Sequence, residues 1–215
     1  MNRISRALPL MLLLAASARA DHRTLSVDVS GAWSAGSVSA LQTTQPQTTL
    51  TFGPSVWLGA RYALTNNLEF SATGLFDIPV TVAHNNVVLA TDSGNFGGTL
   101  VHETMRFGGL VGVRMVLGLA LRFHLGVEVG WSQRLYTGLT MYDDRNPDAA
   151  IDYGLGLHDA SLGQFIVSPL LGLEWAAGDH WSLAVLPRAQ ILLGAQVNWA
   201  VLIPLQFSWN WFIQC

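Results

Sequence analysis

Hydrophobic residues occupy every second position over several long stretches of this chain. The clearest stretch lies near the C-terminus, where the apolar members are Trp199, Val201, Ile203, Leu205, Phe207, Trp209, Trp211 and Ile213. Successive side chains of a β-strand point to opposite faces, so one face of this segment is apolar throughout. Its length exceeds that of an average soluble strand and suits a tilted strand that crosses a membrane, which needs about 9–11 residues.

The same alternation predicts eight strands. We place them near 23–35, 48–64, 68–80, 102–117, 120–136, 162–176, 181–194 and 198–214. Tight turns rich in turn-forming residues connect some of them, near 64–67, 117–119 and 177–180. The other connections are long stretches near 36–47, 81–101 and 137–161 and a short one near 195–197. Short turns on one side and long loops on the other are typical of outer-membrane barrels, with the turns in the periplasm.

The predicted fold is therefore all-β, a transmembrane antiparallel up-and-down β-barrel of eight strands. The barrel must close, because an open sheet edge in hydrocarbon leaves backbone groups without partners. A membrane helix is disfavoured: the best candidate, 107–127, contains Arg114 and Arg122, and a central Arg costs about 2.5–3.5 kcal/mol. The other alternative is a soluble barrel or sandwich with the apolar face inward, but its strands average about five to six residues.

The first twenty residues have the pattern of a secretory signal peptide. Arg3 and Arg6 precede an apolar run, and Ala18-Arg19-Ala20 matches a small-x-small cleavage site. The run is too short to span a bilayer, and the alternative is a buried N-terminal helix. We expect residues 1–20 to be the signal peptide and residues 21–215 to form the barrel. The single cysteine, Cys215, excludes an intrachain disulfide and leaves an inert thiol or pairing with another chain.

Composition narrows the class of partner. Half of the residues are hydrophobic, 12% are charged and none is Lys, which favours a membrane protein or a large buried core. Without the three Arg of the expected signal peptide, 8 Arg face 14 acidic residues. This acidic balance argues against a nucleic-acid partner, which needs a basic surface. We expect contacts with outer-membrane lipid, lipopolysaccharide and the barrel-assembly machinery.

Two segments carry a resemblance to a known family. The stretch Leu58-Gly59-Ala60-Arg61-Tyr62, which runs into the Asn66-Asn67 turn, and the aromatic C-terminal strand resemble the small eight-stranded outer-membrane barrels of the OmpA/OmpX/OmpW-like superfamily. The resemblance covers nearly all of 21–215. It implies a porin-like barrel in the cell outer membrane of a Gram-negative bacterium. Such barrels usually end on an aromatic residue, whereas this chain ends Phe-Ile-Gln-Cys, so the register of the last strand is open.

If the apolar positions face lipid, the alternate positions face the lumen and include many charges. The predicted network consists of Asp28, Arg61, Glu69, Arg106, Arg114, Arg122, His124, Glu128, Glu174 and Arg188. An eight-stranded barrel is only wide enough for side chains to fill it. Unpaired charges in so narrow a space are costly, so we expect ion pairs that plug the lumen. The alternative is a narrow or gated polar pore.

A second set of inward positions is apolar and lies toward the long-loop end. It contains Leu110, Ile166, Leu170, Leu186, Leu192 and Leu202. These side chains could bind a hydrophobic small molecule, as the resemblance to OmpW-like barrels implies. The favoured interpretation is that they pack against one another.

Catalysis is the remaining alternative, because some eight-stranded barrels modify lipid A. The lipid A deacylases carry His and Ser two residues apart on one strand, but here Gly126 follows His124 at that offset. His124, Glu128 and Ser132 are each separated by about 13 Å, far beyond hydrogen-bond reach. The aspartates of 143–159 do not match a calcium loop. We therefore expect no enzyme activity, cofactor or metal, and a structural or surface-interaction role.

Overall fold

The computed structural model describes residues 23–91, 94–143, 146–150, 157–178 and 180–213. Every regular element in these ranges is a strand: β1 (Arg23–Ser39), β2 (Thr48–Thr65), β3 (Leu68–Thr91), β4 (Gly94–Gly118), β5 (Leu121–Asp143), β6 (Asn146–Ala150), β7 (Ala160–Ala176), β8 (Trp181–Val185), β9 (Arg188–Leu193) and β10 (Asn198–Ile213). No helix long and apolar enough to cross a bilayer occurs in these ranges. The expected signal peptide and Cys215 lie outside them.

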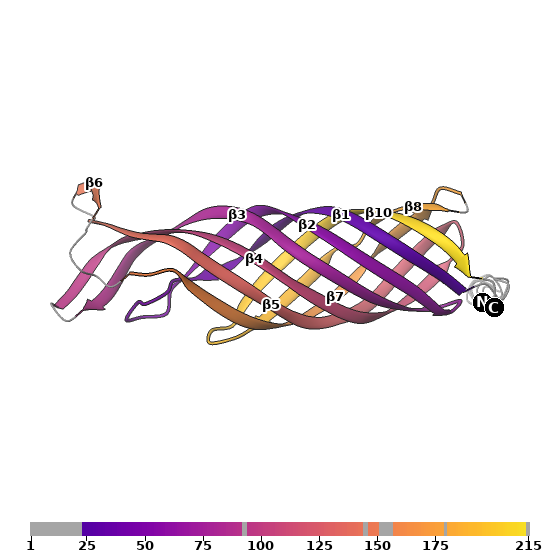
Figure 1. Ribbon diagram of the computed structural model, residues 1–215, viewed down its shortest axis with the longest axis horizontal. Coiled ribbons are helices and arrows are strands. Elements are labelled where there is room, and N and C mark those ends of the chain that lie inside the picture. Colours follow the sequence, from indigo (N-terminus) through magenta and orange to yellow (C-terminus); the bar gives the residue numbers. More distant parts are fainter. Residues whose placement is uncertain (1–22, 92–93, 144–145, 151–156, 179, 214–215) are drawn as a thin grey trace, which may run out of the picture.

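The strands close into an antiparallel barrel (Figure 1). Neighbours follow chain order from β1 to β5, then β7 and β8, and β10 pairs with β1 to complete the ring. β8 and β9 share one register against β7, since Leu173 lies opposite Val185 and Leu170 opposite Arg188. They are two halves of one wall strand, interrupted at Pro187, which has no N–H to donate. β6 pairs only with the end of β5, so eight strands form the wall and the predicted fold is confirmed.

The alternation of the sequence follows the two faces of this wall. Large apolar side chains face outward and are exposed, among them Leu58, Val111, Leu125 and Leu205. Trp33 and Trp131 are exposed at the edge of the apolar belt that faces away from the turns, and Trp181 and Trp211 are exposed near the turns, as the two aromatic girdles of a membrane barrel are. An exterior of this kind is stable in lipid, because exposing so large an apolar surface to water is unfavourable.

The inward face is narrow, and small residues make room for large ones. Gly112 of β4 lies opposite Glu128 of β5, and Gly126 of β5 lies opposite Arg114 of β4. A Cβ at Gly112 would approach Cγ of Glu128 to 2.6 Å, and one at Gly126 would approach Cγ of Arg114 to 3.0 Å. The glycines therefore give the charged side chains the space to lie across the lumen.

The long stretches predicted as loops are partly strand, which corrects the sequence analysis. Residues 81–91 and 94–101 pair as two strands of a hairpin, because β3 continues to Thr91 and β4 begins at Gly94. β5 likewise continues to Asp143. The stretch before β2 is attached to this hairpin: the Thr44 N–H donates to Val88 O, and Gln47 Nε2 donates to Asn86 O. Backbone pairing thus extends the wall beyond the apolar belt, on the left in Figure 1; we call this part the upper extension.

Candidate functional site

A charge network centred on Arg61 of β2 lies at the turn end of the lumen. Its Nε and Nη2 lie 2.8 and 3.1 Å from the carboxylate of Asp28 on β1. Its Nη1 lies 3.3 Å from Glu69 Oε2 on β3 and 2.7 Å from Glu174 Oε2 on β7. The Arg61 and Glu174 side chains are 2% and 0% exposed. Its Nη2 also donates to Ser208 Oγ on β10 at 2.9 Å, so one guanidinium joins five strands of the wall.

Glu174 lies on the opposite side of the ring from Arg61, since β3, β4 and β5 separate β2 from β7. Its other oxygen, Oε1, accepts a hydrogen bond from Arg122 Nη1 at 3.0 Å. His124 Nε2 lies 3.0 Å from Glu174 Oε2. These groups meet across the middle of the barrel, so they connect opposite sides of the wall.

A second charge group, centred on Glu128 of β5, lies next to the first. Its Oε1 accepts hydrogen bonds from Arg114 Nη2 at 2.6 Å and from Ser71 Oγ at 3.0 Å. Its Oε2 lies 3.2 Å from Arg188 Nε. The Arg188 guanidinium also stacks 4.4 Å above the centroid of the Trp57 ring. The negative face of the indole ring attracts this positive charge. We call the residues of both groups the lower network.

Above the lower network the lumen becomes apolar. This layer, the lumen apolar layer, packs Trp57, Leu75, Leu110, Ile166, Leu192, Ala200 and Leu202 together, each at most 5% exposed. Four of the six residues predicted to form an apolar pocket belong to it. Leu170 and Leu186 are also buried but lie outside the cluster. Side chains packed in this way separate the charged lower lumen from the polar groups above.

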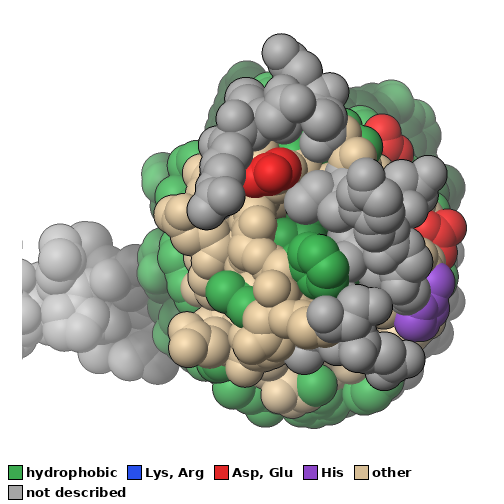
Figure 2. All heavy atoms as spheres, turned by 90° about the vertical axis from the view of Figure 1, so that its left-hand side faces the viewer, with side chains coloured by type: hydrophobic (Ala, Val, Ile, Leu, Met, Phe, Trp, Pro, Cys, Tyr) green, Lys and Arg blue, Asp and Glu red, His purple; other side chains and the backbone are tan. Residues whose placement is uncertain are grey.

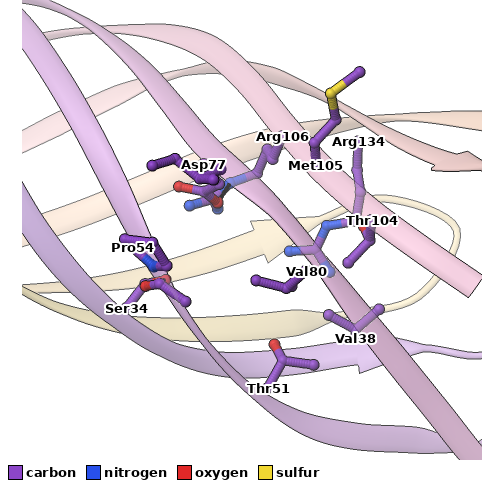
Figure 3. A pocket seen from close by; sticks show the side chains of 12 residues that line it. Ser34, Val38, Thr51, Pro54, Asp77, Val80, Thr104, Met105, Arg106 and Arg134 are labelled. Carbon is purple, nitrogen blue, oxygen red and sulfur yellow. Dashed lines mark hydrogen bonds and ion pairs between the residues drawn. The ribbon is translucent and has the colours of Figure 1, made fainter.

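A small cavity lies on the far side of the lumen apolar layer. Its polar lining includes Asp77, Arg106 and Arg134, together with Thr51 and Thr104, and Figure 3 shows these side chains converging from several strands. The cavity holds about 30 Å³, room for roughly two water molecules. Arg106 Nε donates to Asp77 Oδ2 at 2.8 Å, and Arg134 Nη1 donates to the carbonyl of Ser37 at 3.3 Å. We call this space the upper cavity.

Two histidines lie beyond the upper cavity, within the upper extension. His84 Nε2 and His102 Nε2 are 3.1 Å apart, both residues are 1% exposed, and Tyr136 packs on His102 with ring centroids 5.1 Å apart. Burial, and then the neighbouring His102, lower the pKa of His84 from 6.5 to about 4. Burial also lowers the pKa of His102. The hydrogen bond to the backbone carbonyl of Glu103 opposes this shift, and the positive charge of Arg134 adds a smaller lowering.

The outer end of the upper extension has its own apolar core. It consists of Ala40, Val87, Leu89, Leu100 and Met141, with Phe96 and Leu157 packed against it; we call it the upper apolar cluster. Figure 2 views the molecule from this end, where the coloured side chains include acidic groups and a histidine but no Lys or Arg. Glu103 and Asp159 are exposed acids of the extension. The described part of this face is therefore neutral to acidic.

The ten charged residues predicted for the lumen all lie on the inward face, but not in one network. Arg106 is separated from the other nine by the lumen apolar layer and pairs with Asp77 instead. Sequence reasoning missed Asp77 and Arg134. Both are nevertheless inward positions of the two-residue repeat, counted from Glu69 on β3 and from Arg122 on β5. Sequence reasoning also left out Trp57, the one large apolar residue among the otherwise small or polar inward positions of its strand, which is buried in the lumen.

The two histidines were missed for a different reason. His102 continues the inward alternation of β4 but is the first residue of the strand predicted near 102–117, and it was not included among the lumen residues, whereas His84 falls in the stretch 81–101 that was predicted as loop. Register shifts between Asp77 and Val80 and between His84 and Val87 change the inward phase of β3, and no sequence signal marks such bulges.

Comparison with known proteins shows the fold. No family model and no curated protein matches the chain. Solved structures do match: Neisserial surface protein A is 13% identical with a TM-score of 0.53, covering 86% of this chain and 95% of that one. Ail of Yersinia pestis, solved with the heparin analogue sucrose octasulfate, is 7% identical with a TM-score of 0.55, covering 89% and 100%. OprG of Pseudomonas aeruginosa is 10% identical with a TM-score of 0.54, covering 88% and 96%.

The chain has the fold of the small eight-stranded outer-membrane barrels of the OmpA/OmpX-like kind. Together with the apolar exterior, this fold places it in the cell outer membrane. At these identities the likeness extends to architecture alone, so any specific role must be argued from the lumen and the upper extension. Within the described residues, no group of three or more His, Cys, Asp or Glu could hold a metal ion.

Proposed function

We propose that this protein is a closed outer-membrane barrel that conducts no solute and acts through its upper extension, in a structural or surface-interaction role. The observation that carries the proposal is the 2.7 Å ion pair between Arg61 and Glu174, which lie on opposite sides of the ring. A direct contact across the lumen leaves no continuous water path at that level.

The lumen apolar layer supports the same conclusion by an independent route. A hydrated ion would have to lose its water to pass between side chains as closely packed as Trp57, Ile166 and Leu202, and an unpaired charge in such surroundings is very costly. The lower network and the lumen apolar layer are thus two barriers in series. For the same reason a binding site for a hydrophobic molecule among these side chains is the weaker proposal.

The upper extension supplies the surface for partners. Its described face carries acidic and neutral groups, which suits basic or neutral partners and contact with lipopolysaccharide through divalent cations. A polyanion such as the ligand in the Ail structure would meet no described Lys or Arg on the face that Figure 2 shows. Outer-membrane lipid and the barrel-assembly machinery are further proposed partners, and we propose no catalytic role.

Single-channel recording in planar bilayers tests the closed lumen. Folded wild-type protein is expected to give no discrete conductance steps, whereas the double variant Arg61→Ala with Glu174→Ala should leak ions, because it removes the contact across the lumen. Leu58→Ala, on the lipid side of the same strand as Arg61, is the matched control and should stay silent. Discrete openings of the folded wild-type protein would refute the closed barrel and favour a narrow pore.

A further inference from the structure

The histidine pair of the upper extension has the anchoring pattern of metal-binding imidazoles. A metal-ligating histidine usually binds the ion through one ring nitrogen and uses the other for a hydrogen bond that orients the ring. Here the two Nε2 atoms face each other at 3.1 Å. Both Nδ1 atoms point away, that of His84 to Thr49 Oγ1 at 2.8 Å and that of His102 to the backbone O of Glu103 at 3.4 Å.

The positions of the protons decide what the Nε2 atoms can do. The carbonyl of Glu103 can only accept, so Nδ1 of His102 carries a proton and the Nε2 of the neutral ring is a bare lone pair. The Thr49 hydroxyl can donate or accept. When it donates to His84, His84 carries its proton on Nε2 and donates it to His102. When it accepts, both Nε2 atoms present lone pairs to the same point.

The second arrangement requires a cation between the two nitrogens, because two lone pairs at this distance repel. Zn–N bonds measure about 2.0–2.1 Å, so two imidazoles on one ion lie roughly 2.9–3.4 Å apart for angles from a right angle to the tetrahedral value. The observed separation of 3.1 Å falls within that span. Imidazole is a preferred ligand of Cu²⁺ and Zn²⁺.

We propose that His84 and His102 bind one divalent transition-metal ion of the Cu²⁺ and Zn²⁺ class through their Nε2 atoms. Two protein ligands leave the remaining coordination positions to water. The upper cavity lies further down the same strands: Thr51, Thr104 and Arg134 line it, two residues or about 7 Å along their strands from Thr49, His102 and Tyr136. It can hold roughly two waters, and the hairpin holds both imidazoles on paired strands rather than on a loop.

One charge opposes the site. Arg134 lies near His102, and its positive charge disfavours a second cation there. Its Nη1 is held by the carbonyl of Ser37. The site is therefore expected to bind metal more tightly when this charge is removed, which provides a variant that acts in the opposite direction to loss of a ligand.

The test uses the full chain, refolded in detergent, stripped with a chelator and carrying Cys215→Ser so that the thiol neither binds nor reduces copper. Titration with Cu²⁺ is expected to fill one site per chain. His84→Ala and His102→Ala should each weaken it at least about 100-fold, since even an outer partner of a ligand is worth 10- to 100-fold. Thr49→Val should weaken it about tenfold, and Arg134→Gln should tighten it.

His158→Ala is the matched control, because His158 is an exposed histidine of the same end of the molecule, and its loss should leave the affinity unchanged. Electron paramagnetic resonance of wild-type protein with ¹⁵N-labelled histidine reads the site without any variant and should show coupling to two imidazole nitrogens. Absence of a one-to-one site, coupling to fewer than two histidines, unchanged affinity in folded His84→Ala and His102→Ala, or unchanged affinity in Thr49→Val would overturn the proposal.

Discussion

Glu174 is bound by three cationic or protonatable side chains at once, although it is completely buried. Its two oxygens contact Arg61, Arg122 and His124. A buried ion pair adds little net stability over an apolar packing of the same volume, but the loss of one partner is severe because the others remain buried and uncompensated. The residues that matter most for the stability of the lower network are therefore those with several partners rather than those with the shortest contact.

Replacing Glu174 by Ala is expected to lower the free energy of unfolding by about 3–5 kcal/mol, the cost of an uncompensated buried charge. Urea titration of the refolded protein in detergent measures it. Glu69→Ala is the comparison, because Glu69 also binds Arg61, but at 3.3 Å and from a more exposed position. It should lose clearly less, and equal losses would contradict the central place given to Glu174.

Among the elements, the β3–β4 hairpin departs most from the sequence prediction. The membrane-spanning part of each strand repeats every two residues without interruption, whereas the hairpin contains two register shifts on β3. A shift of one residue moves all later side chains to the opposite face. His84 therefore points inward although its numbering is out of phase with Glu69 and Asp77, and the second shift returns Val87 to their phase.

The lowered pKa of His84 makes the stability of this hairpin depend on pH. Burial disfavours the charged imidazole, so the folded hairpin binds fewer protons than the unfolded chain between pH 6.5 and about 4. The contribution of His84 is fully present above about pH 6.5 and is lost as the pH falls toward 4. The groups that face it are Thr49 and His102, with Arg134 and Tyr136 behind His102.

Hydrogen exchange in chelator-treated buffer measures this effect. After correction for intrinsic exchange rates, protection of residues 81–104 should fall between pH 7.5 and pH 4.5, while the lower parts of the same strands should stay protected. His84→Gln removes the titrating group and should flatten the dependence. Equal protection of the wild-type hairpin at pH 7.5 and pH 4.5 would contradict the role of His84 in this pH dependence.

At the scale of the whole molecule, the interior is layered along the barrel axis: charged, apolar, polar and apolar again. The lower network and lumen apolar layer lie inside the belt that faces lipid, and the upper apolar cluster lies beyond it. The upper extension thus has a core of its own, which allows it to loosen without opening the membrane-spanning wall.

Leu100→Ala tests this independence. Leu100 is completely buried in the upper apolar cluster, and a cavity of this kind typically costs about 2–5 kcal/mol. We expect proteolysis within 81–104 to become faster, while the boiled and unboiled protein still migrate differently on a gel, as an intact barrel does. Val111→Ala on the lipid side of β4 should change neither, and loss of the gel shift in Leu100→Ala would show that the two parts unfold together.

The sequence by itself determined the barrel, the strand phases and which charges face inward, because lipid on one side of a closed wall imposes a strict two-residue repeat. Alternation therefore identified Arg61, Glu128 and Glu174 without any contact information. Which charges meet was decided only by the tertiary structure: Arg61 and Glu174 are 113 residues apart, and ring closure places them opposite each other. Outside the lipid the repeat is no longer imposed, so bulges are tolerated, and only the folded hairpin brings His84 to His102.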